Sequence, residues 1–220
     1  MNNKQDISII NHSSNFNVKP LGNLITVYLV GEITSAENYL DCFDIIRNAS
    51  DDDIVKININ SPGGDLFTTI QFLRAMSETR ATTVASAEGC CMSAATMIFL
   101  SADNYEISDH CLFMVHNYSG ISFGKGGEMY DQLINERKWS EKIIQKIYEN
   151  FLTEDEIKSV LNNKDLWMEG EEVMNRLKAK IEKLGMNAVT APVTEDVKPQ
   201  KKTRTTQTSK SAKITTKKKV

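Results

Sequence analysis

Residues 82–100 read TTVASAEGCCMSAATMIFL, and this stretch decides the fold class. Its first part, residues 82–87, is rich in β-branched and small residues and predicts a strand. Gly89 then turns the chain, and the apolar run from about Met92 to Leu100 predicts a buried helix. A strand that passes directly into a helix is the unit from which α/β folds are built.

The flanking sequence repeats this alternation of strand and helix patterns. Strands are predicted at residues 24–30, 54–60, 105–107 and 111–115, and helices at residues 35–49, after Gly64 through Met76, and at residues 128–151. Thr153 and Glu156 form a capping box that predicts one more short helix. Between them, residues 120–127 form a glycine-rich loop or extended edge. The pattern therefore predicts an α/β fold with mostly parallel strands.

Composition places the chain among ordinary globular proteins. Of the 220 residues, 40% are hydrophobic and 25% are charged. This hydrophobic fraction is sufficient for one domain with a hydrophobic core, and the charged fraction is normal for a globular protein. The sequence has neither an apolar run long enough to span a bilayer nor the pattern of a secretory signal. The four cysteines include no Cys-x-x-Cys pair, so we expect small buried thiols in a reducing compartment, the cytoplasm.

Charge and polarity divide the chain into three parts. Residues 1–20 are polar and predict a flexible N-terminal segment, and residues 21–185 carry the domain. Residues 186–220 predict a disordered tail, because residues 198–220 hold nine Lys or Arg, no acid and almost no apolar side chains. Such a basic arm either contacts nucleic acid or an acidic partner surface, or serves only as a solubilising tail.

Ser93 is the first candidate for chemistry. It follows a predicted strand and starts an apolar helix, where unpaired backbone N–H groups and the helix dipole would stabilise an oxyanion. Ser61-Pro62-Gly63-Gly64 makes a similar strand-to-helix turn and could supply a second oxyanion donor. Taken singly, Ser93 is more often a helix cap and the glycine pair more often a plain tight turn.

His116 and Asp165 are the other two candidates. His116 ends a predicted strand, and histidine is the usual general base for a serine hydroxyl. Asp165 precedes an apolar triplet, so it could be drawn under a histidine and orient it. The alternatives are a hydrogen-bonded histidine at a strand end and an acid in a surface turn.

Together these residues resemble the proteolytic subunit of the Clp protease family over about residues 21–185. The resemblance rests on the Ser-Pro-Gly-Gly turn, the Gly-x-x-x-Ser turn, the histidine at a strand end and the segment that starts at Asp165. These four occur in the family's order, with 23 residues from Ser93 to His116 and 49 from His116 to Asp165.

The resemblance implies a crotonase-like stack of βαβ units with the helix at 128–151 as a projecting handle. It implies a serine endopeptidase with Ser93, His116 and Asp165 as catalytic triad and the N–H groups of Gly64 and Ala94 as oxyanion hole. It further implies two stacked heptameric rings that enclose the active sites, polypeptide substrates, and a partner AAA+ unfoldase that consumes ATP. No metal, cofactor or membrane is implied.

The sequence departs from the family at residues 90–92, at Ala94-Ala95 and at Asn117-Tyr118, which resembles the phage-encoded branch. One alternative is therefore a capsid or scaffold maturation protease of the same fold in a host cytoplasm. A catalytically silent ring subunit is another, although no triad member is missing. The ordered triad disfavours an acyl-CoA enzyme of the crotonase type, and no suitably placed lysine or membrane segment favours a signal-peptide peptidase with a serine–lysine dyad.

Overall fold

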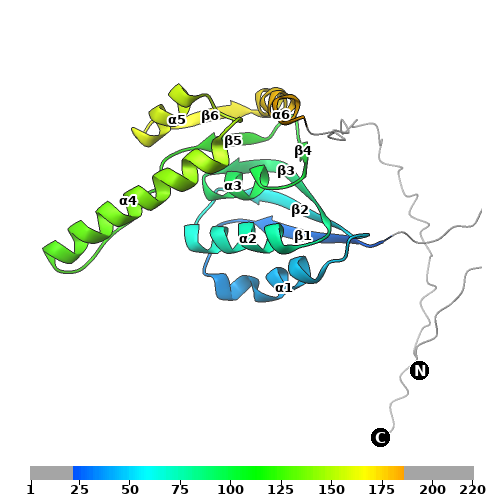
Figure 1. Ribbon diagram of the computed structural model, residues 1–220, viewed down its shortest axis with the longest axis horizontal. Coiled ribbons are helices and arrows are strands. Elements are labelled where there is room, and N and C mark those ends of the chain that lie inside the picture. Colours follow the sequence, from blue (N-terminus) through cyan, green and yellow to red (C-terminus); the bar gives the residue numbers. More distant parts are fainter. Residues whose placement is uncertain (1–21, 186–220) are drawn as a thin grey trace, which may run out of the picture.

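Three consecutive strand–helix–strand units form the centre of the structure (Figure 1). The computed structural model describes residues 22–185, so the expectations for residues 1–20 and 186–220 concern residues outside the described part. In chain order the elements are β1 (Leu24–Val30), the 3-10 helix η1 (Ala36–Tyr39), α1 (Leu40–Asn48), β2 (Ile54–Ser61), α2 (Leu66–Glu78), β3 (Thr82–Met92), α3 (Ala94–Leu100), β4 (Asn104–Ile107), β5 (Leu112–Val115), α4 (Gly126–Tyr148), α5 (Glu154–Leu161), β6 (Leu166–Glu169) and α6 (Gly170–Leu184).

The described strands form one sheet in the order β1-β2-β3-β5-β6, with β4 also paired to β3. All pairs are parallel except β5 with β6, which is antiparallel. The prediction of a mostly parallel α/β sheet is confirmed. Since parallel strands joined by helices run in the same direction, the carboxyl ends of β2, β3 and β5 lie on one edge of the sheet.

β3 is longer than predicted, because it continues past residue 87 to Met92. A bulge separates its two halves: Ile59 pairs with Ala87, but Ser61 pairs with Cys91. The side-chain oxygen of Asn60 accepts the N–H of Cys90 at 3.0 Å and so satisfies a group that the bulge leaves out of the ladder. The first half of β3 then pairs with β4 and the second with β5.

The core lies between the sheet and the layer of α1, α2 and α3. Val55, Ile57 and Ile59 alternate along β2 and are all fully buried. Phe43 of α1 and Phe72 of α2 meet edge to face, with ring centroids 4.8 Å apart. On the other face of β2, Lys56 pairs with Glu106 at 2.6 Å. The period-two alternation of the strand therefore decides which face the helices cover.

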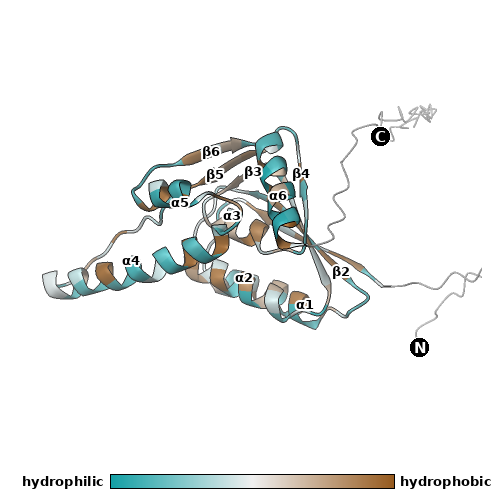
Figure 2. Ribbon diagram, turned by 45° about the horizontal axis from the view of Figure 1, so that its top comes forward, coloured by the Kyte–Doolittle hydropathy of each residue, from teal (hydrophilic) through white to brown (hydrophobic). Residues whose placement is uncertain are grey.

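α4 leaves this body and projects from it (Figure 1). Its buried residues are Ser140, Ile144 and Tyr148, all in its second half, which contacts α3 and α5. Hydrophobic and hydrophilic residues alternate along its length (Figure 2). The predicted long helix is confirmed, although it begins two residues earlier and ends three residues earlier than the range 128–151.

Two elements were not predicted from the sequence. β6 and α6 follow Asp165, and α6 packs on β5 and β6. Residues 120–125 contain no strand, so this part is loop rather than extended edge. No helix within residues 22–185 combines the length and the apolar character needed to cross a membrane.

Candidate active site

Four chain segments meet at the carboxyl edge of the sheet. β2 ends at Ser61, β3 at Met92 and β5 at Val115, and each end is followed directly by residues that the sequence singled out. β6 runs antiparallel to β5, so its first residues lie at this same edge. The fold therefore gathers the candidate residues that are far apart in the sequence.

Ser93 occupies the sharp turn between β3 and α3. Its backbone has φ 53° and ψ −128°, a conformation that a residue with a side chain rarely adopts. Its N–H donates to the carbonyl of Met114 in β5 at 2.8 Å, which holds the turn against the neighbouring strand. A strained serine between a strand and a helix presents its hydroxyl at the top of the sheet, as a nucleophile requires.

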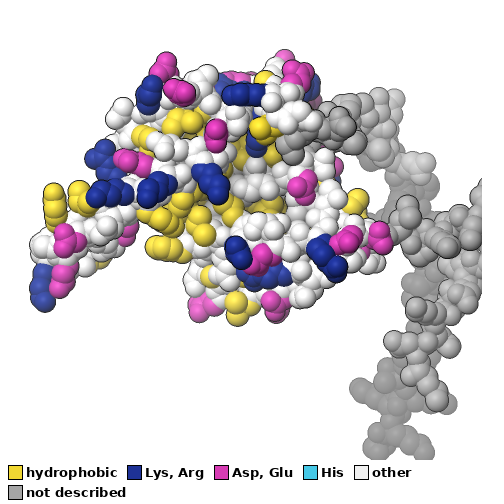
Figure 3. Space-filling model, viewed as in Figure 1, with side chains coloured by type: hydrophobic (Ala, Val, Ile, Leu, Met, Phe, Trp, Pro, Cys, Tyr) yellow, Lys and Arg dark blue, Asp and Glu magenta, His cyan; other side chains and the backbone are white. Residues whose placement is uncertain are grey.

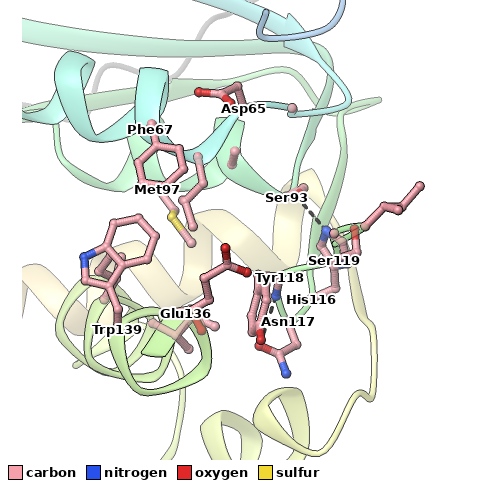
Figure 4. Close-up of a pocket in the computed structure, with 18 residues that line it drawn as sticks. Asp65, Phe67, Ser93, Met97, His116, Asn117, Tyr118, Ser119, Glu136 and Trp139 are labelled. Carbon is pink, nitrogen blue, oxygen red and sulfur yellow. Dashed lines mark hydrogen bonds between the residues drawn. The ribbon is translucent and has the colours of Figure 1, made fainter. Parts of the chain in front are cut away.

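The hydroxyl of Ser93 lies 2.5 Å from Nε2 of His116 (Figure 4). With the ring proton on Nδ1, Nε2 accepts the hydroxyl hydrogen, which is the geometry of a nucleophile and its general base. The structure thus brings together the first two residues of the predicted triad. A short turn and a strand end are sufficient to place them, because β3 and β5 are hydrogen-bonded neighbours.

Asp165 occupies the position next to the antiparallel pair Val115–Leu166. If this register continues by one residue, Asp165 lies opposite His116. Residues opposite each other in an antiparallel pair project from the same face of the sheet, with Cβ atoms about 5 Å apart. Asp165 is exposed, and among the hydrogen bonds of the described residues none joins it to His116. Asp165 therefore lies opposite His116 in the strand register, but its side chain is not hydrogen-bonded to the pair formed by Ser93 and His116.

The glycine turn after β2 lies against the serine turn. Gly63 has φ +95°, and a Cβ there would lie 2.7 Å from both the carbonyl oxygen of Met92 and Cβ of Ser93. Gly64 has φ +146°, and a Cβ there would collide with the backbone of Ile33. Only glycine permits both the backbone angles and this close approach.

The same turn presents backbone donors to the site. Ile33 bonds to the carbonyl of Gly63 and to the N–H of Asp65, each at 2.8 Å, which leaves the N–H of Gly64 between them. Within residues 22–185 no hydrogen bond is recorded from the N–H of Gly64 or from that of Ala94, the first residue of α3. These are the two groups predicted as an oxyanion hole, and both residues line the cavity beside Ser93.

A buried hydroxyl pair anchors the serine turn from below. Thr96 donates to the carbonyl of Ser93 at 2.6 Å, and its oxygen also lies 2.6 Å from the hydroxyl of Tyr148. Tyr148 is fully buried at the end of α4, and this burial raises its phenol pKa above the ordinary value. α4 is thus tied directly to the turn that carries Ser93, a link that no motif in the sequence indicated.

The cavity beside Ser93 has a volume of about 370 Å³. Apolar side chains of α2, α3 and α4 form its walls, and hydrophobic side chains gather where α4 meets α2 (Figure 3). Phe67 and Trp139 stack with centroids 5.3 Å apart. Neither wall residue was predicted from the sequence, and the position of Phe67 three residues after Gly64 was the only local signal for either.

The sequence matches the Clp protease family over residues 21–176. A point mutant of ClpP1 from Listeria monocytogenes has a similar structure, with a TM-score of 0.56 and 21% identity over 69% of this chain and 86% of that chain. No curated protein sequence matches significantly. The structural likeness confirms the predicted fold, an α/β, crotonase-like stack of βαβ units with a projecting helix.

Proposed function

The chain belongs to the Clp protease family, whose members are peptidases, and we propose that it is a serine endopeptidase. In this proposal Ser93 is the nucleophile, His116 is the general base and Asp165 orients the histidine. The observation that carries the proposal is the 2.5 Å contact between the hydroxyl of Ser93 and Nε2 of His116 at a strained strand-to-helix turn. Two backbone donors beside the hydroxyl, the N–H groups of Gly64 and Ala94, have no partner within residues 22–185 and support it.

The first half of the reaction acylates the enzyme. Oγ of Ser93 attacks the scissile carbonyl carbon while its proton passes to Nε2 of His116, and the oxyanion is held by the N–H groups of Gly64 and Ala94. The tetrahedral intermediate then collapses, the C–N bond breaks, and His116 returns the proton to the leaving amine. The product of this half is an ester of Ser93 with the acyl part of the substrate.

The second half restores the serine. Water attacks the ester carbonyl while Nε2 of His116 takes one of its protons, and the C–O bond to Ser93 breaks as that proton is delivered to Oγ. Asp165 acts throughout by fixing the tautomer of His116 and stabilising the imidazolium. The register that sets Asp165 opposite His116 supports this role, with a side-chain rotation completing the contact when substrate binds.

The proposal extends to assembly. Family membership favours a ring-shaped homo-oligomer of heptameric rings with the active sites inside, acting on polypeptides fed by an AAA+ unfoldase in the cytoplasm. The projecting end of α4 supports such an assembly, because Ile121 and Phe123 beside it are 82% and 88% exposed and Tyr130 on it is 66% exposed. Native mass spectrometry tests this part, and a stable monomer at working concentration would contradict it.

Labelling with a fluorophosphonate tests the chemistry. We expect the probe to modify Ser93, with loss of labelling in Ser93→Ala and a large decrease in His116→Ala. Ser86→Ala and His110→Ala are the matched controls, since both lie away from the cavity and are expected to be labelled at the wild-type rate. Labelling that survives in Ser93→Ala would refute the assignment.

A further inference from the structure

The cavity beside Ser93 has a carboxylate next to its aromatic wall. Glu136 projects from α4 into the cavity that Phe67, Met97 and Trp139 line (Figure 4). It lies three residues before Trp139, so the two share one face of the helix. The carboxylate of Glu136 therefore belongs to the lining of this cavity.

Glu136 differs from two other glutamates on α4 in that it has no positively charged partner among the described residues. Glu128 and Glu141, also on α4, are paired with Lys125 and Arg137. Within residues 22–185 Glu136 forms no ion pair, and its carboxylate accepts a single hydrogen bond, from the amide of Gln132 to Oε1 at 2.6 Å. One carboxylate oxygen is left for a further donor.

The rest of the cavity supplies no compensating charge. Its described lining includes no Lys or Arg, and the other acid there is Asp65. The carboxylate of Asp65 is committed to the N-terminus of α2, where it accepts the N–H of Thr68 at 2.6 Å. Asp65 is exposed and is the N-cap of α2, whereas Glu136 is half-buried and caps no helix. Of the two carboxylates in the described lining, Glu136 is therefore the better placed to meet a ligand inside the cavity.

We infer that the cavity is the P1 subsite of the proposed peptidase and that Glu136 selects a basic P1 side chain, arginine or lysine; this inference rests on the proposed function. The residue whose carbonyl is attacked must lie against Ser93 and the N–H groups of Gly64 and Ala94, so its side chain enters this cavity. The carboxylate then determines which side chain fits.

A long basic side chain can contact both the aromatic wall of the cavity and the carboxylate of Glu136. Its methylene stem packs on the stacked rings of Phe67 and Trp139, and its charged end meets Glu136. An apolar P1 residue would instead remove water from the carboxylate without replacing the lost hydrogen bonds, which is costly. Cleavage after basic residues is therefore favoured over cleavage after leucine or phenylalanine.

Two phosphonate probes test the inference on the full chain. They are peptidyl diphenyl phosphonates that carry arginine or its neutral near-isostere citrulline at P1, and the second-order rate of Ser93 labelling is measured by intact-protein mass spectrometry. We expect the arginine probe to react at least about tenfold faster, the difference between a charged and a neutral hydrogen bond. In Glu136→Gln this ratio falls to near one.

Two further variants complete the design. Asp131→Asn removes an exposed carboxylate of α4 that does not line the cavity, so the arginine-to-citrulline ratio should stay at its wild-type value. Glu136→Lys should reverse the preference, so that a probe with glutamate at P1 reacts faster than one with glutamine. This reversal does not depend on the absolute rate of either variant.

The outcomes separate this inference from the proposed function. If a fluorophosphonate without a side chain labels Ser93 but the wild type does not distinguish arginine from citrulline, the role of Glu136 is wrong and the peptidase assignment stands. A ratio that persists in Glu136→Gln has the same consequence. If the fluorophosphonate does not label Ser93 at all, the proposed function fails and the subsite inference fails with it.

Discussion

The N–H of Ser93 donates a hydrogen bond to the carbonyl of Met114, two residues before His116, at 2.8 Å. The turn that carries Ser93 and the strand that precedes His116 are therefore joined by a backbone hydrogen bond as well as by their side chains. Because this bond does not involve the hydroxyl of Ser93 or the imidazole, substitution of either side chain should leave the turn in place.

Asp165→Asn tests the orienting role of the acid. If Asp165 fixes the tautomer of His116, the amide should lower kcat by about 10³–10⁴-fold while the unfolding free energy stays within about 0.5 kcal/mol of the wild type, because the side chain is exposed. Peptide hydrolysis and urea unfolding are the measurements. Glu169→Gln, which changes an exposed acid at the end of β6, is the control, and equal rates for the two variants would remove Asp165 from the proposed triad.

Gly63→Ala tests the contact between the two turns. The added Cβ would lie 2.7 Å from Met92 and Ser93 at a φ of +95°, so we expect destabilisation of more than about 1 kcal/mol together with loss of fluorophosphonate labelling. Gly127→Ala is the control, because its Cβ would meet no atom within 4 Å and it lies in α4, where alanine is expected to stabilise by about 0.5–1 kcal/mol. Full labelling of Gly63→Ala would contradict the close packing.

Thr96→Val tests the buried link between α4 and the serine turn. The valine removes the bond to the carbonyl of Ser93 and leaves the hydroxyl of Tyr148 buried without its partner, so we expect a loss of about 1–3 kcal/mol in urea unfolding. Tyr148→Phe should cost less, and the double variant should show a coupling of at least about 0.5 kcal/mol. Tyr130→Phe, which is 66% exposed, should be neutral. Strict additivity of Thr96 and Tyr148 would rule out the link.

Glu156 makes the stability depend on pH. The paired guanidinium of Arg176, at 2.7 and 2.9 Å, and the bonds from Thr153 lower the pKa of this carboxyl to about 2. Its folded pKa is below its unfolded value of about 4.3, so the stabilisation is fully present above that value and is lost as the pH falls through about 2.

Glu156→Gln should therefore destabilise by about 1–3 kcal/mol at pH 6, with a difference from the wild type that shrinks towards pH 2. Thermal or urea unfolding across this range is the measurement. Glu154→Gln, an exposed acid in the first turn of the same helix, should show no such change with pH. A difference for Glu156→Gln that is constant from pH 6 to pH 2 would contradict the ion pair with Arg176.

The sequence by itself determined the alternation of strands and helices and the positions of the chemical candidates. Hydrophobic period and turn residues are local properties, so residues 24–30 and 54–60 were correctly predicted as strands. The capping box at Thr153 was correct for the same reason, since both of its hydrogen bonds lie within four residues. Ser93 and His116 were found because each directly follows a strand.

Only the tertiary structure decided what surrounds those candidates. The side chain of Asn60 accepts the N–H of Cys90 at the bulge in β3, and the antiparallel pairing of β6 sets the register of Asp165. In the sequence Glu136 is one of many polar residues in a long helix, and only the placement of α4 beside Ser93 shows that it lines the cavity. The physical reason is that register, helix placement and cavity walls arise from contacts between residues far apart in the chain, whereas propensity and periodicity report only on neighbours.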